Sequence, residues 1–177
     1  ATLTQLTNWT LSDVFEPGST FKVLTIASAI ENGRLQENSK ILDTGKLDID
    51  KWTIKNYDYN VKPFPGNIDL YYLFEHSSNV ASAKAALMMT KQEHYNVLKK
   101  FGIGEKTGID LPGESRGLIP DYKDWHKSTH ASVGYGYSIS VTAIQMVSAI
   151  SAIANNGVRV TLHVLKYTPE EEVEKIK

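Results

Sequence analysis

The stretch that most constrains the fold runs from Glu16 to Lys22, with the sequence Glu-Pro-Gly-Ser-Thr-Phe-Lys. A turn ends at Pro17-Gly18, and apolar residues then recur on nearly every side of a predicted helix of about four turns that stops at Gly33. A helix that is apolar all round is buried, so we expect the rest of the chain to pack around it.

Ser19 and Lys22 lie three residues apart in this stretch, so both side chains point to one face of the first helical turn. A serine hydroxyl becomes a nucleophile when a neighbouring base removes its proton. A lysine in apolar surroundings has a lowered pKa and can be that base. The alternative is that Ser19 or Thr20 caps the helix while Lys22 points to solvent. The Ser-x-x-Lys spacing alone does not decide between the two.

The composition excludes several other classes of protein. The formal net charge of -1 gives no electrostatic case for nucleic acid or an anionic membrane surface as partner. The chain has no cysteine, which excludes disulfides, thiolate catalysis and thiolate metal sites. No apolar run reaches membrane-spanning length, and no signal-peptide pattern opens the chain. Its 177 residues are enough for one domain.

The hydrophobic pattern predicts a helix-rich α+β fold. Residues 46–50 and 52–54 alternate and indicate a small hairpin, and residues 158–164 alternate as a strand. Helices are expected over residues 68–76, 80–89 and 90–101, after Ser140 or Thr142, and in a charged tail over 170–177. Thr90 and Glu93 have the spacing of a capping box, and we expect His94 to be solvated on the same helix.

A second polar cluster, Ser77-Ser78-Asn79, separates two of these helices. In a short loop, a serine and an asparagine two residues apart can point into one space. The serine can relay a proton, and the asparagine offers donors and an acceptor to an amide. Serine and asparagine also favour the N-cap of a helix, and a cap is compatible with a functional role.

Taken together, these motifs make the chain resemble the transpeptidase domain of a penicillin-binding protein, most closely the class B, transpeptidase-only type. The resemblance covers most of residues 8–161. Its motifs, in order, are Glu-Pro-Gly-Ser-Thr-Phe-Lys, His-Ser-Ser-Asn-Val-Ala, Thr-Gly-Ile-Asp-Leu-Pro-Gly-Glu and Gly-Tyr-Gly. These proteins cross-link peptidoglycan during elongation or division.

The resemblance implies a role for each matching residue. Ser19 would be the acylated nucleophile, Lys22 its base, Ser77 a proton relay and Asn79 the residue that holds the substrate amide. Gly134 and Gly136 would bring the backbone close to the substrate. The implied acyl donor is a stem peptide ending in D-Ala-D-Ala, which β-lactams imitate, and no cofactor is implied. The five histidines show no metal-ligand spacing.

One departure from the family pattern concerns its third motif, Lys-Thr/Ser-Gly on a strand. The chain's Lys106-Thr107-Gly108 precedes the last predicted helix and leads into Pro112, so we interpret it as an accidental match. We therefore expect residues 1–177 to be a partial domain of the penicillin-binding-protein and β-lactamase type, with a buried central helix and most of its antiparallel sheet missing. On its own it would be nearly inactive and prone to self-association. The parent would be membrane-anchored through other parts, with this domain outside the cytoplasm.

Two other functions stay open at this point. One is a β-lactamase or a β-lactam sensor with the same serine and lysine. The rate of deacylation would distinguish a β-lactamase, which releases the drug quickly, from a transpeptidase, which holds it. The other is a non-catalytic binding module.

Overall fold

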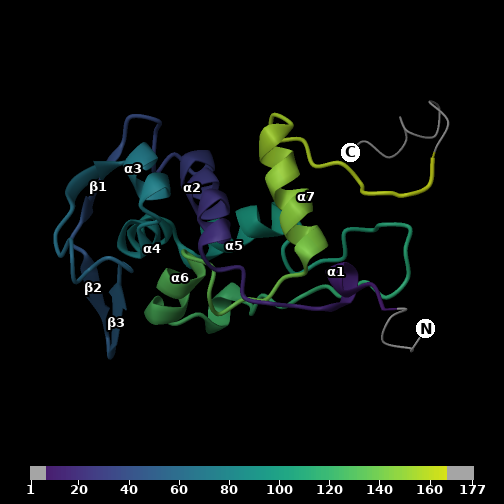
Figure 1. The fold of residues 1–177 in the computed structure, drawn as a ribbon, viewed down its shortest axis with the longest axis horizontal. Coiled ribbons are helices and arrows are strands. Elements are labelled where there is room, and N and C mark those ends of the chain that lie inside the picture. The colour runs from purple at the N-terminus through teal and green to yellow at the C-terminus, as the bar shows by residue number, and fades with distance from the viewer. Residues whose placement is uncertain (1–6, 167–177) are drawn as a thin grey trace. The chain divides into compact units, whose positions relative to one another are not determined.

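The computed structural model describes residues 7–166, which fall into two compact units (Figure 1). The larger unit comprises residues 17–98 and 120–139. The smaller unit comprises, within the described part of the chain, residues 7–16, 99–119 and 140–166. Helices predominate, and the strands form two antiparallel pairs. This is the helix-rich α+β class that the sequence predicts.

The Ser19 segment of the larger unit begins with a 3-10 turn, η2 (Gly18–Phe21), and continues as helix α2 (Lys22–Glu31). Most side chains of α2 are buried, as the apolar pattern predicts. The helix stops where Gly33 adopts a φ of 65° and the Arg34 N–H turns back to the Ala29 carbonyl. The predicted stop at Gly33 is therefore confirmed.

Two small sheets flank the helices of the larger unit. Strands β2 (Lys46–Ile49) and β3 (Trp52–Lys55) form the predicted hairpin. Strands β1 (Lys40–Asp43) and β4 (Gly66–Asp69) pair antiparallel and were not predicted. The helix expected from residue 68 begins later, as α3 (Leu70–Glu75), because the Asp69 side chain caps it by accepting the Tyr72 N–H.

Helix α4 (Asn79–Leu87) lies at the centre of the larger unit, in contact with α2, α6 (Lys127–Val133), β1 and β3. Its small side chains allow this close packing. A Cβ added to Gly134, just after α6, would lie 2.7 Å from the Ala86 Cβ and 2.9 Å from the Ser82 carbonyl oxygen. Two buried apolar clusters include residues of α4: one contains Ala81 and Ala85, the other Val80 and Ala83.

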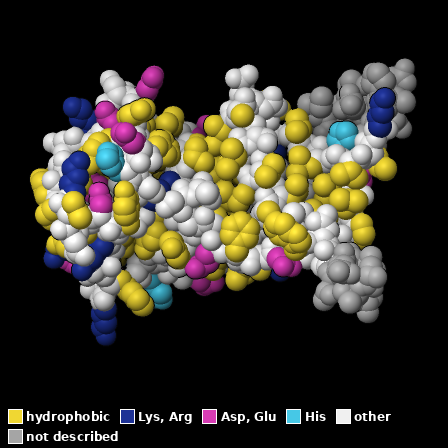
Figure 2. Space-filling model, in the orientation of Figure 1, with side chains coloured by type: hydrophobic (Ala, Val, Ile, Leu, Met, Phe, Trp, Pro, Cys, Tyr) yellow, Lys and Arg dark blue, Asp and Glu magenta, His cyan; other side chains and the backbone are white. Residues whose placement is uncertain are grey.

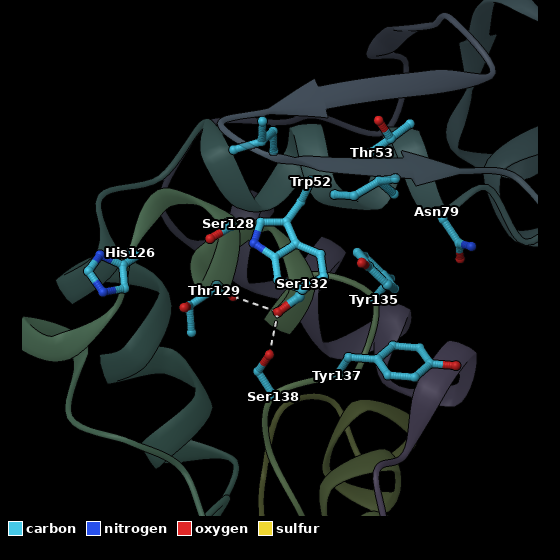
Figure 3. A pocket seen from close by; sticks show the side chains of 12 residues that line it. Trp52, Thr53, Asn79, His126, Ser128, Thr129, Ser132, Tyr135, Tyr137 and Ser138 are labelled. Atoms are coloured by element: carbon cyan, nitrogen blue, oxygen red, sulfur yellow. Dashed lines mark hydrogen bonds between the residues drawn. The ribbon is translucent and has the colours of Figure 1, made fainter.

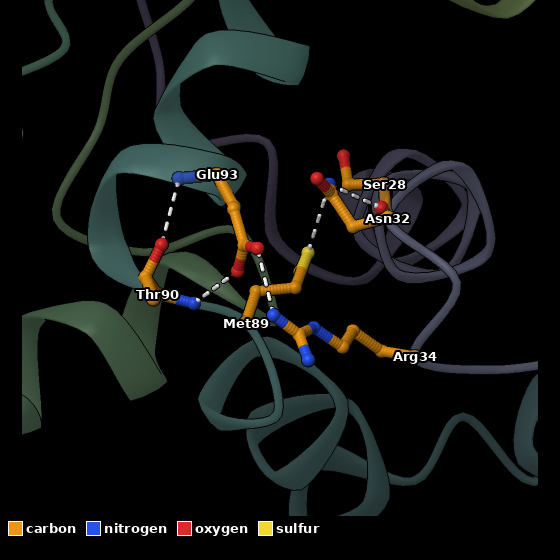
Figure 4. A network of polar contacts seen from close by, with 6 residues as sticks. All are labelled: Ser28, Asn32, Arg34, Met89, Thr90 and Glu93. Atoms are coloured by element: carbon orange, nitrogen blue, oxygen red, sulfur yellow. Dashed lines mark hydrogen bonds and ion pairs between the residues drawn. The ribbon is translucent and has the colours of Figure 1, made fainter.

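Helix α5 (Lys91–Lys100) opens with the predicted capping box (Figure 4). The Glu93 N–H donates to Thr90 Oγ1 at 3.1 Å, and the Thr90 N–H donates to Glu93 Oε2 at 2.7 Å. Glu93 Oε1 also accepts from Arg34 Nη2 at 2.7 Å, which links this helix start to the end of α2. Thr90 and Glu93 thus confirm the pattern read from the sequence.

His94, by contrast, is buried, so the expectation that it is solvated is wrong. Its ring lies 6.0 Å from that of Trp125 and 5.3 Å from that of His130, measured between centroids. Trp125 follows the short 3-10 helix η3 (Tyr122–Asp124), and its carbonyl accepts a hydrogen bond from Lys91. These partners are more than thirty positions further along the chain, which the local pattern could not indicate.

In the smaller unit, helix α7 (Ala143–Ala154) contacts the short helix α1 (Trp9–Ser12). Thr142 caps α7 in a capping box with Gln145, which confirms one of the two predicted caps. The Gln145 amide donates to the carbonyls of Glu105 and Arg116 and so secures the preceding loop. Hydrophobic side chains reach the surface over much of the face in Figure 2.

The strand expected over residues 158–164 is absent from the described part of the chain, where these residues have no regular structure. Instead, the Asp110 carboxylate accepts the N–H groups of Val164 and Leu165, so this segment is held by a side chain. The tail predicted over 170–177 lies outside the described residues. Within residues 7–166, every helix is too short or too polar to cross a membrane.

Candidate active site

Ser19 is exposed in the η2 turn, at the entrance to the buried helix α2. Its hydroxyl is not used as a helix cap, because η2 and α2 have no side-chain cap. Thr20 Oγ1 instead donates to the Pro17 carbonyl at 2.8 Å. The turn therefore leaves the Ser19 hydroxyl available for chemistry, against the alternative that it caps the helix.

Lys22 is only 1% exposed, so the alternative that it points to solvent is wrong. Burial lowers the pKa of this lysine to about 8, so an appreciable fraction of the amine is neutral near that pH. Its Nζ donates to the Ser77 carbonyl and lies 2.9 Å from Ser77 Oγ. Among the described residues, Ser77 is thus the hydrogen-bond partner of the amine, and Ser19 lies one turn earlier on the same segment.

In the Ser77-Ser78-Asn79 loop, the residue that caps the helix is a different one from the two candidate functional residues. Ser77 has a φ of 50°, a left-handed conformation that is costly for a side chain with a Cβ. Ser78 is the N-cap of α4, with its hydroxyl accepting the Ala81 N–H at 2.9 Å. The capping role therefore falls on the middle serine. Ser77 is left to contact Lys22, and Asn79 Nδ2 donates to the Lys55 carbonyl at 3.0 Å.

A buried carboxylate that was not predicted from the sequence holds this loop through hydrogen bonds. Asp43 is fully buried at the end of β1 and accepts four hydrogen bonds. One comes from Ser78 Oγ at 2.6 Å, one from the Gly45 N–H at 2.7 Å, and two from Asn56 Nδ2 at 2.9 and 3.1 Å. Asn56 Oδ1 in turn accepts the Val80 N–H. Asp43 and Ile41 share the buried face of one strand, and that alternation was the available sequence signal.

Gly136 brings a third segment against the Ser19 turn. The Gly18 N–H donates to the Gly136 carbonyl at 3.0 Å, and Gly136 has a φ of 85°. A Cβ at this position would lie 2.1 Å from the Gly18 carbonyl oxygen, which no side chain can tolerate. At Gly136 the close backbone approach is therefore to the Ser19 turn, and the substrate contact expected of this glycine stays a prediction. At Gly134 the close approach is to helix α4, through Ser82 and Ala86.

The remaining sequence candidates lie elsewhere. Lys106-Thr107-Gly108 is in irregular structure, and the Glu114 carboxylate accepts both the N–H and the hydroxyl of Thr107. This agrees with its interpretation as an accidental match to a strand motif. Within residues 7–166, no group of three or more His, Asp or Glu side chains is placed to hold a metal ion.

Comparison with known proteins assigns the family. Residues 1–177 match the family model described as the penicillin binding protein transpeptidase domain. The chain is 34% identical over 165 residues to penicillin-binding protein PbpB of Mycobacterium tuberculosis, which covers 93% of this chain and 24% of that protein. It is 32% identical over 169 residues to peptidoglycan D,D-transpeptidase FtsI of Escherichia coli, covering 96% of this chain and 28% of that one.

Solved structures agree with this assignment. The apo transpeptidase domain of Burkholderia pseudomallei penicillin-binding protein 3 matches 94% of this chain and 49% of its own, with a TM-score of 0.85 and 28% identity. Penicillin-binding protein 3 of Mycobacterium tuberculosis complexed with ampicillin matches 94% of this chain and 36% of its own, with a TM-score of 0.82 and 33% identity. The chain belongs to the penicillin-binding protein transpeptidase domain family. It spans about a quarter of the length of the curated relatives.

Proposed function

We propose that this chain contributes the nucleophile and the proton-transfer groups to a peptidoglycan D,D-transpeptidase that also binds penicillin covalently. The observation that carries the proposal is the contact between the buried Lys22 amine and Ser77 Oγ, one helical turn from the exposed Ser19. A lysine with its pKa near 8 can accept a proton at neutral pH without a metal or cofactor.

In the proposed acylation, Ser19 Oγ attacks the carbonyl carbon of the penultimate D-Ala of a stem peptide, and its proton passes to Lys22 Nζ. When the tetrahedral intermediate collapses, the C–N bond to the terminal D-Ala breaks. Lys22 returns the proton to the leaving amine through Ser77 Oγ, which lies 2.9 Å away. An acceptor amine then attacks the acyl-enzyme, loses a proton by the same route and releases Ser19.

Asn79 is proposed to hold the substrate amide. One hydrogen of its Nδ2 binds the Lys55 carbonyl, which fixes the side chain and leaves Oδ1 to accept a substrate N–H. A β-lactam would follow the same route, with its ring C–N bond breaking and the leaving nitrogen staying attached. The complexes of the Mycobacterium tuberculosis relative with aztreonam and ampicillin support this class of ligand.

We also propose that residues 1–177 alone acylate slowly and that the activity belongs to the full-length protein. Lys106-Thr107-Gly108 is held in a loop by Glu114, so it does not provide the strand of the family's third motif. In serine hydrolases, losing one oxyanion donor costs roughly 3 kcal/mol in the barrier. We place the full-length protein at the membrane with this domain outside the cytoplasm, where its proposed substrate lies.

The experiment is labelling of the full-length protein with a fluorescent penicillin. Ser19→Ala should abolish labelling, whereas Thr20→Ala, which removes the neighbouring hydroxyl, should leave most of it. Persistent labelling of Ser19→Ala would remove Ser19 as the nucleophile. A label released within minutes would indicate a β-lactamase rather than a transpeptidase.

A further inference from the structure

A pocket of about 580 Å³ lies within the larger unit, beside the proposed catalytic groups (Figure 3). Its walls come from the β2–β3 hairpin, helix α6 and the segment 135–138. Asn79 is the residue of the proposed mechanism that lines it, whereas Ser19, Lys22 and Ser77 do not. The volume is within the range of about 300–1,000 Å³ that small-molecule sites occupy.

One wall of the pocket is an exposed tryptophan. The Trp52 side chain at the start of β3 is 70% exposed, and Figure 3 shows its indole between the hairpin and helix α6. Tyr137 is 47% exposed, and its ring lies 5.3 Å from that of Tyr135. A flat apolar ring of this size gains substantially from being covered, and tryptophan and tyrosine dominate binding surfaces for this reason. The pocket therefore offers flat apolar faces to a ligand.

Hydroxyl groups from helix α6 also line the pocket. Ser128, Thr129 and Ser132 of α6 line it. Ser132 Oγ lies 2.6 Å from Ser138 Oγ and donates to the Thr129 carbonyl at 3.0 Å. Hydroxyls both donate and accept, so this wall suits a ligand that itself carries hydroxyl and amide groups.

The lining includes His126 but no Asp, Glu, Lys or Arg. A charged ligand group would lose hydration there without gaining a carboxylate, ammonium or guanidinium partner, so the pocket favours an uncharged ligand. Flat apolar faces, several hydroxyls and the lack of Asp, Glu, Lys and Arg side chains together match a sugar ring, which presents C–H groups on its faces and hydroxyls at its rim.

We propose that this pocket binds a neutral saccharide unit, with one face of the ring packed on Trp52 and its hydroxyls bonded to the Ser132–Ser138 pair. The proposal goes beyond the proposed acyl transfer and does not require that Ser19 be reactive. Because Asn79 lines the pocket as well, a saccharide held here would lie next to any substrate amide bound to Asn79.

The experiment is calorimetric titration of the full-length protein with a neutral tetramer of β-1,4-linked N-acetylglucosamine. We expect saturable binding that Trp52→Ala weakens at least tenfold and Trp52→Phe weakens less, because Phe keeps a flat ring. Trp9→Ala is the matched control, since Trp9 is 64% exposed in the smaller unit. The Trp9→Ala protein should bind the saccharide with the affinity of the unchanged protein. Ser132→Ala should weaken binding severalfold.

Absence of saturable binding, or equal affinity in Trp52→Ala, would overturn the proposal. The proposal would also be overturned if Trp52→Ala weakened the binding of a D-Ala-D-Ala peptide but left the affinity for the saccharide unchanged. Penicillin labelling of the same preparations reports whether each variant is folded. If the unchanged protein is labelled normally by penicillin but does not bind the saccharide, this inference alone is refuted and the proposed acyl transfer still stands.

Discussion

Replacing Asp43 by alanine tests whether the buried carboxylate holds the Ser77-Ser78-Asn79 loop in place. In the substituted protein, the Gly45 N–H and Asn56 Nδ2 lose the acceptor that the structure gives them. Ser78 Oγ loses its 2.6 Å bond but can turn to Asn56 Oδ1, 3.3 Å away. An unsatisfied buried donor costs about 1–3 kcal/mol, so the two donors left without an acceptor predict a loss of about 2–6 kcal/mol in the free energy of unfolding.

The same change should slow acylation, because Ser77 is positioned by this loop and contacts the Lys22 amine. We expect penicillin labelling of the folded Asp43→Ala protein to be roughly tenfold slower or more, equivalent to about 1.4 kcal/mol in the barrier. Urea denaturation followed by circular dichroism measures the stability. Labelling rates in the absence of urea measure the effect on the site.

Asp48→Ala is the control, because Asp48 lies in the next strand, β2, accepts a hydrogen bond from Thr53 Oγ1 at 2.5 Å and has a side chain that is 61% exposed. Its stability should change by less than about 0.5 kcal/mol, as for most surface substitutions. The reasoning would be refuted if Asp43→Ala unfolded at the same urea concentration as the unchanged protein. It would also fail if the variant were labelled at the unchanged rate.

Three further predictions follow from charges and backbone geometry. If neutral Lys22 is the base, acylation should fall about tenfold per pH unit below its pKa of about 8 and level off above it; a rate independent of pH between 6 and 9 would contradict this. Burial lowers the pKa of His94 to about 3 and that of His130 to about 4. In the unfolded chain these histidines have a pKa of about 6.5, so as the pH falls below 6.5 the unfolded chain binds protons that the folded protein does not. Stability is therefore complete above pH 6.5 and should be lower at pH 5 by about 2 kcal/mol per histidine, which urea midpoints would measure and a flat profile would disprove. Gly136→Ala forces a Cβ against the Gly18 carbonyl and should both destabilise the protein by more than about 1 kcal/mol and slow acylation; alanine at Gly113, which has the same φ of 85° but open space around it, should carry the backbone strain alone and leave acylation unchanged.

Local patterns in the sequence predicted much of the fold. The all-round apolar run gave helix α2, the alternation gave the β2–β3 hairpin, and the Thr90–Glu93 spacing gave the capping box. In each case the deciding interaction joins residues that are close in the chain. The Ser-x-x-Lys spacing left two alternatives open, and the structure decides between them with a buried lysine and an exposed serine.

The parts that sequence reasoning missed depend on distant partners. β1 pairs with β4, more than twenty residues away, and the ring partners of His94 are Trp125 and His130. Nothing in the sequence next to Asp43 shows that its carboxylate is buried, because its partners Asn56 and Ser78 lie well away in the chain. The alternation over residues 158–164 failed for the same reason, since a strand needs a neighbour and the described residues provide none.

The most direct test of the central claim is to locate the acylated residue by mass spectrometry. The full-length protein would be treated with ampicillin, digested, and its peptides searched for the added mass of the drug. The account predicts one adduct, on the hydroxyl of Ser19, in the peptide that contains Pro17 and Lys22. An adduct on Ser77 or another residue, or a fully folded protein that carries no adduct, would contradict it.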